Sequence, residues 1–199
     1  MTLNRREYNK QETVRHIRSV FMSLYAETGI DGITVGALCK ACGVAKSTFY
    51  LYYEDKYQVL EAVEDDVLSQ LREVCDGLRS CDFRNDSAET LLTQTRGIAR
   101  CLTKNGDTLR ALMGKYGDPR FSYKWKRNIT DAFRDSFRAE KGDNPSAEIA
   151  CTIFSSSLLG LYTLFLFDEP RVTERELSVI LINLARFSLF DFEALAEDS

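Results

Sequence analysis

Apolar residues recur at helical spacing along most of the chain, beginning with residues 9–28. Positions three and four apart share one face of a helix, so such a repeat predicts a helix with one buried face. Asn9 and Glu12 are spaced as a capping box at the start of this stretch, and Gly29 is suited to end it. The predicted buried stripe is Val14, Ile17, Phe21, Leu24 and Tyr25.

Two short helices and a turn are predicted next, in residues 34–52. Val35, Leu38 and Cys39 share one face of the first helix, and Gly43 supplies the backbone freedom that a sharp turn needs. In the second helix, from residue 45 to about residue 52, Phe49 is the expected inward anchor. This is the helix-turn-helix arrangement, whose second helix can lie in the DNA major groove.

Periodic stretches and helix-stop signals continue to the end of the chain. Asp55 with Gln58 can cap the fourth helix, Asp86 or Ser87 the fifth, Asp107 the sixth, and Thr173 with Glu176 the ninth. Pro119 and Pro145 stand where the seventh and eighth helices begin. The predicted ranges are 56–76, about 87–105, 108–116, 119–141, 145 to about 168, and 174 to about 192. The sequence therefore predicts an all-α protein of about nine helices.

Polar side chains of the second short helix, and those near it, carry the chemistry expected of a DNA-binding surface. A lysine, hydroxyls and closely spaced tyrosines can donate to phosphates and to base edges. Phosphate contacts are predicted for Thr34, Tyr50, Tyr52 and Lys56. Base-edge contacts are predicted for Lys46, Ser47 and Thr48. Arg5 and Arg6 lie in a predicted polar arm, residues 1–8, which either reaches the DNA or is a solvated terminus.

The segment ITVGALCKACGVAKSTFYLYYEDKYQVL resembles the DNA-binding domain of TetR-family transcription regulators. The resemblance covers roughly the first third of the chain, and the shared features are Gly43-Val44, Thr48-Phe49-Tyr50, Tyr52-Tyr53 and Lys56. Cys39 and Cys42 depart from it, because the family usually has alanines there. The resemblance implies a helix-turn-helix domain in residues 1–57 and a helical regulatory and dimerisation domain in residues 58–199.

The last two predicted helices carry more apolar residues than a small domain needs to cover. Residues 149–167 contain no charged side chain, which also suits a membrane span, but the interspersed Thr, Ser and Gly favour a helix buried on most sides. Two copies of the chain could bury the excess in a four-helix bundle. TetR-family proteins dimerise through these helices, so we expect a homodimer. The predicted interface residues are Leu158, Leu161, Phe165, Ile180, Leu184 and Phe187.

TetR-family proteins often hold a ligand in the second domain, and the aromatic residues of the predicted seventh helix could line such a pocket. These residues, with two that precede the helix, together predict a site for a small apolar or aromatic effector, although ordinary core packing is the simpler explanation for any one of them. The candidate lining is Met113, Tyr116, Phe121, Trp125, Phe133 and Phe137. Residues 109–127 and 154–167 also resemble a TetR subgroup that includes activators of dihydroxyacetone kinase genes, in which the partner can be a protein.

Composition narrows the remaining classes of function. The 199-residue chain has a net charge of −4, yet residues 1–57 carry two more basic than acidic side chains. The single histidine, His16, has no catalytic partner, and Cys39 and Cys42 lack the further ligands of a zinc site. We therefore expect no enzyme activity, catalytic residue, metal or cofactor. Six cysteines without a signal-peptide pattern predict reduced thiols in the cytoplasm, with no membrane association.

The function predicted from the sequence is sequence-specific transcription regulation by a homodimer on palindromic double-stranded DNA. A repressor released by an effector in the second domain is the main prediction. The alternative is a TetR-like coactivator that works mainly through a protein partner.

Overall fold

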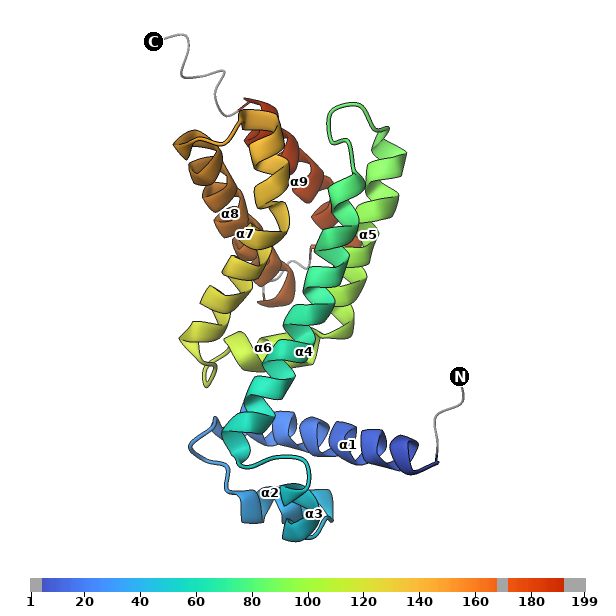
Figure 1. Ribbon diagram of the computed structural model, residues 1–199, viewed down its shortest axis with the longest axis vertical. Coiled ribbons are helices and arrows are strands. Elements are labelled where there is room, and N and C mark those ends of the chain that lie inside the picture. Colours follow the sequence, from blue (N-terminus) through green and yellow to red (C-terminus); the bar gives the residue numbers. More distant parts are fainter. Residues whose placement is uncertain (1–4, 168–171, 192–199) are drawn as a thin grey trace. The chain divides into compact units, whose positions relative to one another are not determined.

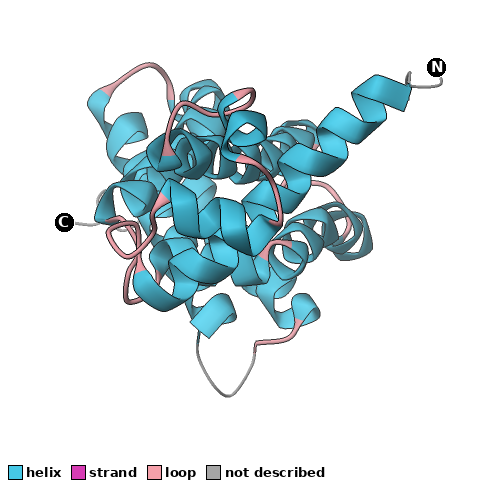
Figure 2. Ribbon diagram, turned by 90° about the horizontal axis from the view of Figure 1, so that it is seen from below, coloured by secondary structure: helices cyan, strands magenta, loops and turns pink. Residues whose placement is uncertain are grey.

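The computed structural model describes residues 5–167 and 172–191, and every regular element in these ranges is helical (Figures 1 and 2). The prediction of an all-α chain with about nine helices is confirmed for this part of the chain. A 3₁₀ turn at Gly77–Ser80 follows α4, and a π-helical turn at Phe187–Asp191 follows α9. The helices are α1 (Arg5–Thr28), α2 (Val35–Cys42), α3 (Lys46–Tyr50), α4 (Lys56–Asp76), α5 (Ala88–Lys104), α6 (Gly106–Met113), α7 (Pro119–Lys141), α8 (Pro145–Phe167) and α9 (Glu174–Arg186).

The described residues belong to two compact units. The head unit contains residues 5–67 and 110–119, and the body unit contains residues 68–109, 120–167 and 172–191. Helix α4 contributes to both units, because its residues up to Val67 belong to the head and those from Leu68 belong to the body. The predicted DNA-binding domain, residues 1–57, falls within the head unit as far as it is described. Its boundary at residue 57 stays a prediction.

Several helix starts follow the predicted capping signals. Thr173 and Glu176 form the reciprocal capping box of α9, and the Ser87 hydroxyl accepts from the N–H of Thr90 at the start of α5. Helix α8 begins at Pro145, as predicted. Because a cap satisfies N–H groups that have no partner within the helix, these short polar signals predict helix ends well.

The start of α1 differs from the prediction. The helix begins at Arg5, so residues 5–8 form its first turn rather than an irregular arm, and residues 1–4 lie outside the described residues. Glu12 consequently sits inside the helix, where it pairs with Arg15 at 2.6 Å. Arg, Glu, Lys and Gln are good helix formers, and nothing in residues 5–12 breaks a helix. Helix α6 also begins two residues earlier than predicted, at Gly106, so Asp107 lies in its first turn.

The head unit has its own buried core, to which residues 110–119 contribute. Phe21 and Tyr25 of α1 are fully buried, with ring centroids 5.9 Å apart. Burial raises the pKa of the Tyr25 phenol, and a backbone hydrogen bond with Asp118 partly lowers it. At Gly29, which ends α1 with φ +67°, an added Cβ would lie 3.1 Å from the Cβ of Tyr116. Residues 110–119 therefore pack against the end of α1.

The body unit contains an aromatic cluster between α7 and α8. The Trp125 ring stacks on the Tyr162 ring at 5.6 Å between centroids, and Phe121 lies 6.1 Å from Trp125. Phe133 and Phe137 both pack on Phe154, at 5.0 and 5.5 Å. Helix α5 packs against α8 and α9, and α8 packs against α9. Close packing of this kind makes the cluster part of the core.

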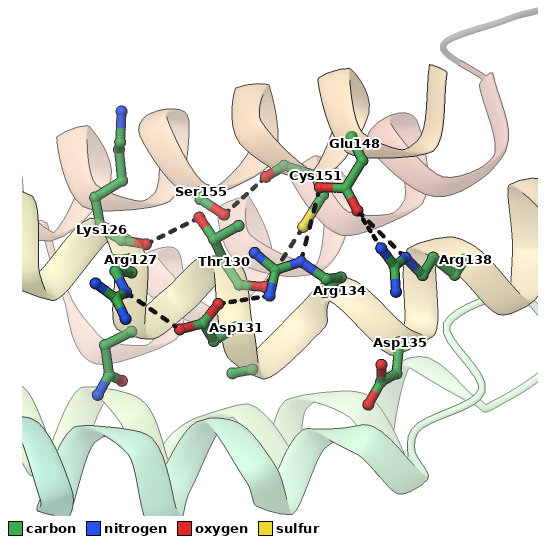
Figure 3. A network of polar contacts seen from close by, with 12 residues as sticks. Lys126, Arg127, Thr130, Asp131, Arg134, Asp135, Arg138, Glu148, Cys151 and Ser155 are labelled. Atoms are coloured by element: carbon green, nitrogen blue, oxygen red, sulfur yellow. Dashed lines mark hydrogen bonds and ion pairs between the residues drawn. The ribbon is translucent and has the colours of Figure 1, made fainter. Parts of the chain in front are cut away.

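A polar seam runs along the outside of the contact between α7 and α8 (Figure 3). Arg134 donates to Asp131 at 2.7 Å and lies 3.7 Å from Glu148, which also accepts from Arg138 at 3.0 Å. All four side chains are more than 30% exposed, and exposed ion pairs contribute about 0–1 kcal/mol each. The seam therefore contributes little to the stability of the fold.

Helix α8 is buried on one face, not on most sides as predicted. Phe154, Leu158 and Tyr162 point into the body core, whereas Ile153 and Leu164 are 41% and 42% exposed. The helix is long and apolar enough to cross a membrane by length and composition, but core helices pass the same test. Its packing against α5 and α9 supports the core interpretation. The exposed face therefore keeps large apolar side chains that the single chain does not cover.

Candidate nucleic-acid interface

The helix-turn-helix of the head unit is built by a cap, a left-handed glycine and one buried ring. The Thr34 hydroxyl accepts from the N–H of Ala37 at the start of α2. Gly43 ends α2 with φ +67°, where its N–H and that of Val44 satisfy free carbonyls of the helix. Phe49 is fully buried, 5.5 Å from the Tyr50 ring and 5.8 Å from the Tyr53 ring. These contacts turn the opposite face of α3 outward.

The outward face of α3 holds most of the residues predicted to contact DNA. Lys46, Ser47 and Tyr50 are exposed, and Thr48 is half-buried. The ammonium of Lys46 lies over α2, 3.7 Å from the position that a Cβ on Gly36 would occupy. Thr34 is also exposed, so its hydroxyl can donate outward while its oxygen caps α2. Tyr52 is half-buried in the turn after α3.

Lys56 has a structural role that the sequence did not indicate. Its ammonium donates to the carbonyl of Ile30 at 2.8 Å and to that of Ile33 at 2.9 Å. Two of its three donors therefore close the turn between α1 and α2. One donor remains for a phosphate, so the predicted DNA contact would be a second task for this side chain.

Lys56→Met is expected to destabilise the head unit, because it leaves the carbonyls of Ile30 and Ile33 without their charged donor. Hydrogen bonds to charged groups contribute about 1.5–3 kcal/mol, and we expect a loss of about 1–3 kcal/mol in the free energy of unfolding. Denaturant unfolding measures this change. An unaltered unfolding curve together with weaker DNA binding would show that Lys56 acts on phosphate alone.

Tyr53 and Arg18 are a pair that sequence reasoning missed. Tyr53 is buried, and its hydroxyl accepts from Nε of Arg18 at 2.8 Å. Nearby on α1, Nε2 of His16 lies 3.1 Å from the carbonyl oxygen of Cys42. Both contacts tie α1 to the helix-turn-helix. The partners are 35 and 26 residues apart in the chain, so no local spacing could have signalled them.

The head unit contains two buried thiols, Cys39 and Cys42. Both are free, and the pKa of Cys42 is raised by burial and, to a smaller extent, by the nearby Cys39. A raised pKa keeps the thiol protonated and poorly reactive. No group of three or more His, Cys, Asp or Glu side chains among the described residues could hold a metal ion. These observations agree with the interpretation of both cysteines as small core residues.

The residues predicted to line an effector pocket do not share one unit. Met113 and Tyr116 belong to the head unit, and Tyr116 is 42% exposed. The four on α7 belong to the body unit and are buried, and Phe133 and Phe137 pack tightly on α8. Core packing therefore accounts for Phe133 and Phe137. Phe121 and Trp125 are packed as closely, and the effector lining as a whole stays a prediction.

The residues predicted to form the dimer interface differ in how far their side chains are exposed in the single chain. Leu158 is 0% exposed and Leu161 is 9% exposed within the single chain, so neither has much surface left for a partner. Phe165 and Leu184 are half-buried. Ile180 and Phe187 are 42% and 45% exposed. We define the α8/α9 face as the exposed apolar residues of these two helices and the turn after α9: Ile149, Ile153, Leu164, Phe167, Val179, Ile180 and Phe187.

Comparison with known proteins agrees with this geometry. Residues 17–63 match the family model of bacterial regulatory proteins of the tetR family. The HTH-type transcriptional regulator EthR of Mycobacterium tuberculosis is 24% identical over 179 residues, covering 84% of this chain and 82% of that protein.

Solved structures share the fold. A TetR transcriptional regulator from Streptococcus agalactiae aligns over 90% of this chain and 96% of its own, with a TM-score of 0.62 and 22% identity. The dihydroxyacetone kinase operon activator DhaS aligns over 89% and 96%, with a TM-score of 0.60 and 14% identity. The family match in residues 17–63, the relatives and the shared fold together show that this chain is similar to the TetR-family transcriptional regulators.

Proposed function

We propose that this protein is a homodimeric repressor that binds palindromic double-stranded DNA through α3 and is released by an effector in the body unit. The observation that carries the DNA-binding part is the outward face of α3. Lys46, Ser47 and Tyr50 are exposed there, while Phe49 holds the helix from inside. A cation, hydroxyls and a phenol on one solvent-facing helix suit the major groove and its phosphates.

Dimerisation is supported by the α8/α9 face. Its exposed apolar side chains would be covered in a four-helix bundle formed by α8 and α9 of two copies. Exposed small residues on α8, such as Ser156 and Gly160, would allow a second helix to approach closely, and nothing lies within 4 Å of an added Cβ at Gly160. A two-fold dimer presents two copies of α3, which matches a palindromic site with half-sites about 34–36 Å apart.

An effector would regulate DNA binding through α4 and α6, because each of these helices belongs partly to the head unit and partly to the body unit. Both helices contribute residues to the head and to the body. A ligand that shifts the body ends of these helices would change the separation of the two heads in a dimer. The half-site spacing would no longer match, and DNA affinity would fall in proportion to the ligand's preference for the shifted state.

The experiment that tests this function is selection of binding sites from random duplex DNA, followed by salt titration of the selected site. We expect a palindromic sequence and a steep loss of affinity with salt, because phosphate contacts release counterions. A coactivator that works through a protein partner is the second candidate, and one protein that shares the fold, DhaS, is named as an operon activator. Absence of any selected sequence would reject the repressor and favour the coactivator.

Tyr50→Phe tests the assignment of phosphate contacts. Tyr50 is 56% exposed at the end of α3, and removing its hydroxyl leaves the ring contact with Phe49 in place. We expect affinity to fall about 3- to 10-fold, as for one lost hydrogen bond, and by the same factor on every DNA sequence. Affinities for the selected site and for single-base variants measure this. A changed order of preference among the variants would contradict the phosphate role.

A further inference from the structure

Two arginines of the body unit, one on α4 and one in the 3₁₀ turn after it, donate to backbone carbonyls of α7. Arg72 donates to the carbonyl oxygens of Asn128 and Asp131, both at 3.4 Å. Arg79 donates to that of Ala132 at 3.2 Å and to that of Asp131 at 3.5 Å. We call these four hydrogen bonds the α4–α7 clamp, because two guanidinium groups hold one stretch of the α7 backbone.

Asp76 orients both guanidinium groups. It lies four residues after Arg72 and accepts from its Nε at 3.1 Å, and it lies three residues before Arg79, whose Nε is also 3.1 Å away. In the opposite direction, Asn128 of α7 donates through Nδ2 to the carbonyl of Leu68 on α4 at 3.4 Å. A carboxylate shared by two arginines fixes the direction of their remaining donors, so the clamp is a connected network.

Helix α7 does not need the clamp to complete its own hydrogen bonds. Residues 128, 131 and 132 lie inside α7, so each of their carbonyls already has a partner in the N–H four residues further on. The arginines therefore use the second lone pair of each oxygen. Apolar packing has no direction, whereas hydrogen bonds from a planar guanidinium to fixed backbone oxygens do. What the clamp adds is a defined rotation and axial position of the body half of α4 on α7.

The clamp acts on a helix that both units share. Val67 is the last residue of α4 in the head unit, and Leu68 is the first in the body unit. Between Lys56 and Asp76 the helix contains no glycine or proline, the residues that most often kink a helix. A change in how the body unit holds α4 would therefore change the direction of its head end.

We propose that the α4–α7 clamp sets the direction in which α4 leaves the body unit, and with it the half-site spacing that a dimer accepts on DNA. Arg72, Asp76 and Arg79 are positioning residues, because they act through α4 and not on the DNA itself. One base pair added between half-sites moves them about 3.4 Å apart and turns them by about 35°, so a firmly held α4 accepts a narrow range of spacings. This inference deepens the proposed function, since it rests on a dimer that binds palindromic DNA.

A distance measured within one chain tests the clamp without DNA. Nitroxide labels at Leu51→Cys in the head unit and Tyr123→Cys in the body unit, both exposed positions, report this distance by pulsed electron paramagnetic resonance. Cys81→Ser removes the native thiol that is not buried, and an excess of unlabelled protein keeps two labelled chains from meeting in one dimer. We expect the Arg72→Met/Arg79→Met double variant to widen the distance distribution about twofold, because α4 then samples more orientations.

DNA duplexes that carry the selected palindrome, with one or two base pairs added or removed between the half-sites, test the consequence. We expect wild type to prefer one spacing and the double variant to lose about 5- to 10-fold of that preference, while affinity at the best spacing falls about 2- to 3-fold through lost preorganisation. Arg127→Met is the matched control. Arg127 is 72% exposed and lies 3.7 Å from the carboxylate of Asp131, not its carbonyl, so we expect the wild-type preference.

An unchanged distance distribution in the double variant would overturn the proposal, and so would a widened distribution with an unchanged spacing preference. A lower Tm with both readouts unchanged would show that the clamp only stabilises the fold. Arg79→Met alone keeps the bonds of Arg72 and provides the same test if the double variant does not fold. If wild type selects no palindrome, the DNA-binding proposal fails by itself, while the distance measurement still decides whether the clamp holds α4.

Discussion

Phe49→Ala is expected to unfold the helix-turn-helix and to abolish specific DNA binding while the body unit stays folded. Phe49 is 0% exposed and contacts the rings of Tyr50 and Tyr53, so truncation leaves a cavity beneath α3. Such substitutions cost about 3–5 kcal/mol, which is a large part of the 5–15 kcal/mol that stabilises a typical small domain. We expect the affinity for the selected site to fall at least about 100-fold.

Hydrogen exchange resolved along the chain would measure this effect. Amides of α1 to α3 should lose protection, whereas those of α5 and α9 should keep it, because the body unit has its own core. Leu51→Ala is the matched control. Leu51 lies two residues away and is 77% exposed, so we expect little change in stability. Retained protection of α3 in Phe49→Ala, with affinity within about threefold of wild type, would show that Phe49 is not the anchor of this helix.

Ile180→Asp is expected to convert the proposed dimer into monomers and to weaken binding to the selected DNA site by about 100-fold or more. Ile180 is 42% exposed in the single chain and lies on the α8/α9 face, so a dimer of the proposed kind would bury the new carboxylate without a partner. Each monomer keeps its own fold, because the side chain is not part of the monomer core. Two linked heads bind two half-sites with an avidity that separate heads lack, and this gain commonly reaches 10²–10⁴.

Analytical ultracentrifugation and titration with operator DNA would measure the two consequences. Tyr123→Asp is the control, because it places the same charge at another exposed position, on α7 and away from the α8/α9 face. We expect this control to stay dimeric and to bind DNA normally. A dimeric Ile180→Asp protein with unchanged affinity would exclude the α8/α9 face as the interface and move the search to another surface.

Local signals predicted the helices well where the physical cause was itself local. The capping box of Thr173 and Glu176 needs only residues within one turn, and Gly43 needs only its own backbone freedom. The predicted start of α1 at about residue 9 was wrong for a related reason. Asn9 and Glu12 have the spacing of a cap, but a helix continues through such a pair when the preceding residues also favour helix.

Helical periodicity also predicted which residues face inward, but it did not predict which distant residues they contact. It identified Phe49 as the anchor of α3, and the structure buries that ring. It could not reveal that Tyr53 receives a hydrogen bond from Arg18, or that Lys56 closes the turn between α1 and α2. A tyrosine and a lysine near a DNA-binding helix look alike in sequence whether they point to phosphate or to the protein's own backbone.

The same limit applies to the second half of the chain. Leu158 and Ile180 are both apolar residues on helices with an apolar excess, yet Leu158 is fully buried within its own chain and Ile180 is exposed. Phe133 and Trp125 are both aromatic residues of α7, yet Phe133 packs on Phe154 while Trp125 stacks on a tyrosine whose hydroxyl has no partner among the described residues. These differences depend on the neighbouring helix.

The sequence by itself determined the helical class, most helix ends and the residues offered by α3, because caps, turns and amphipathic spacing act over a few residues. The tertiary structure alone decided that residues 110–119 pack into the head unit, that Lys56 is partly occupied by backbone carbonyls, and that Leu158 belongs to the core. The physical reason is that a helix's own sequence sets which face is apolar. The arrangement of distant helices then sets which part of that face is covered.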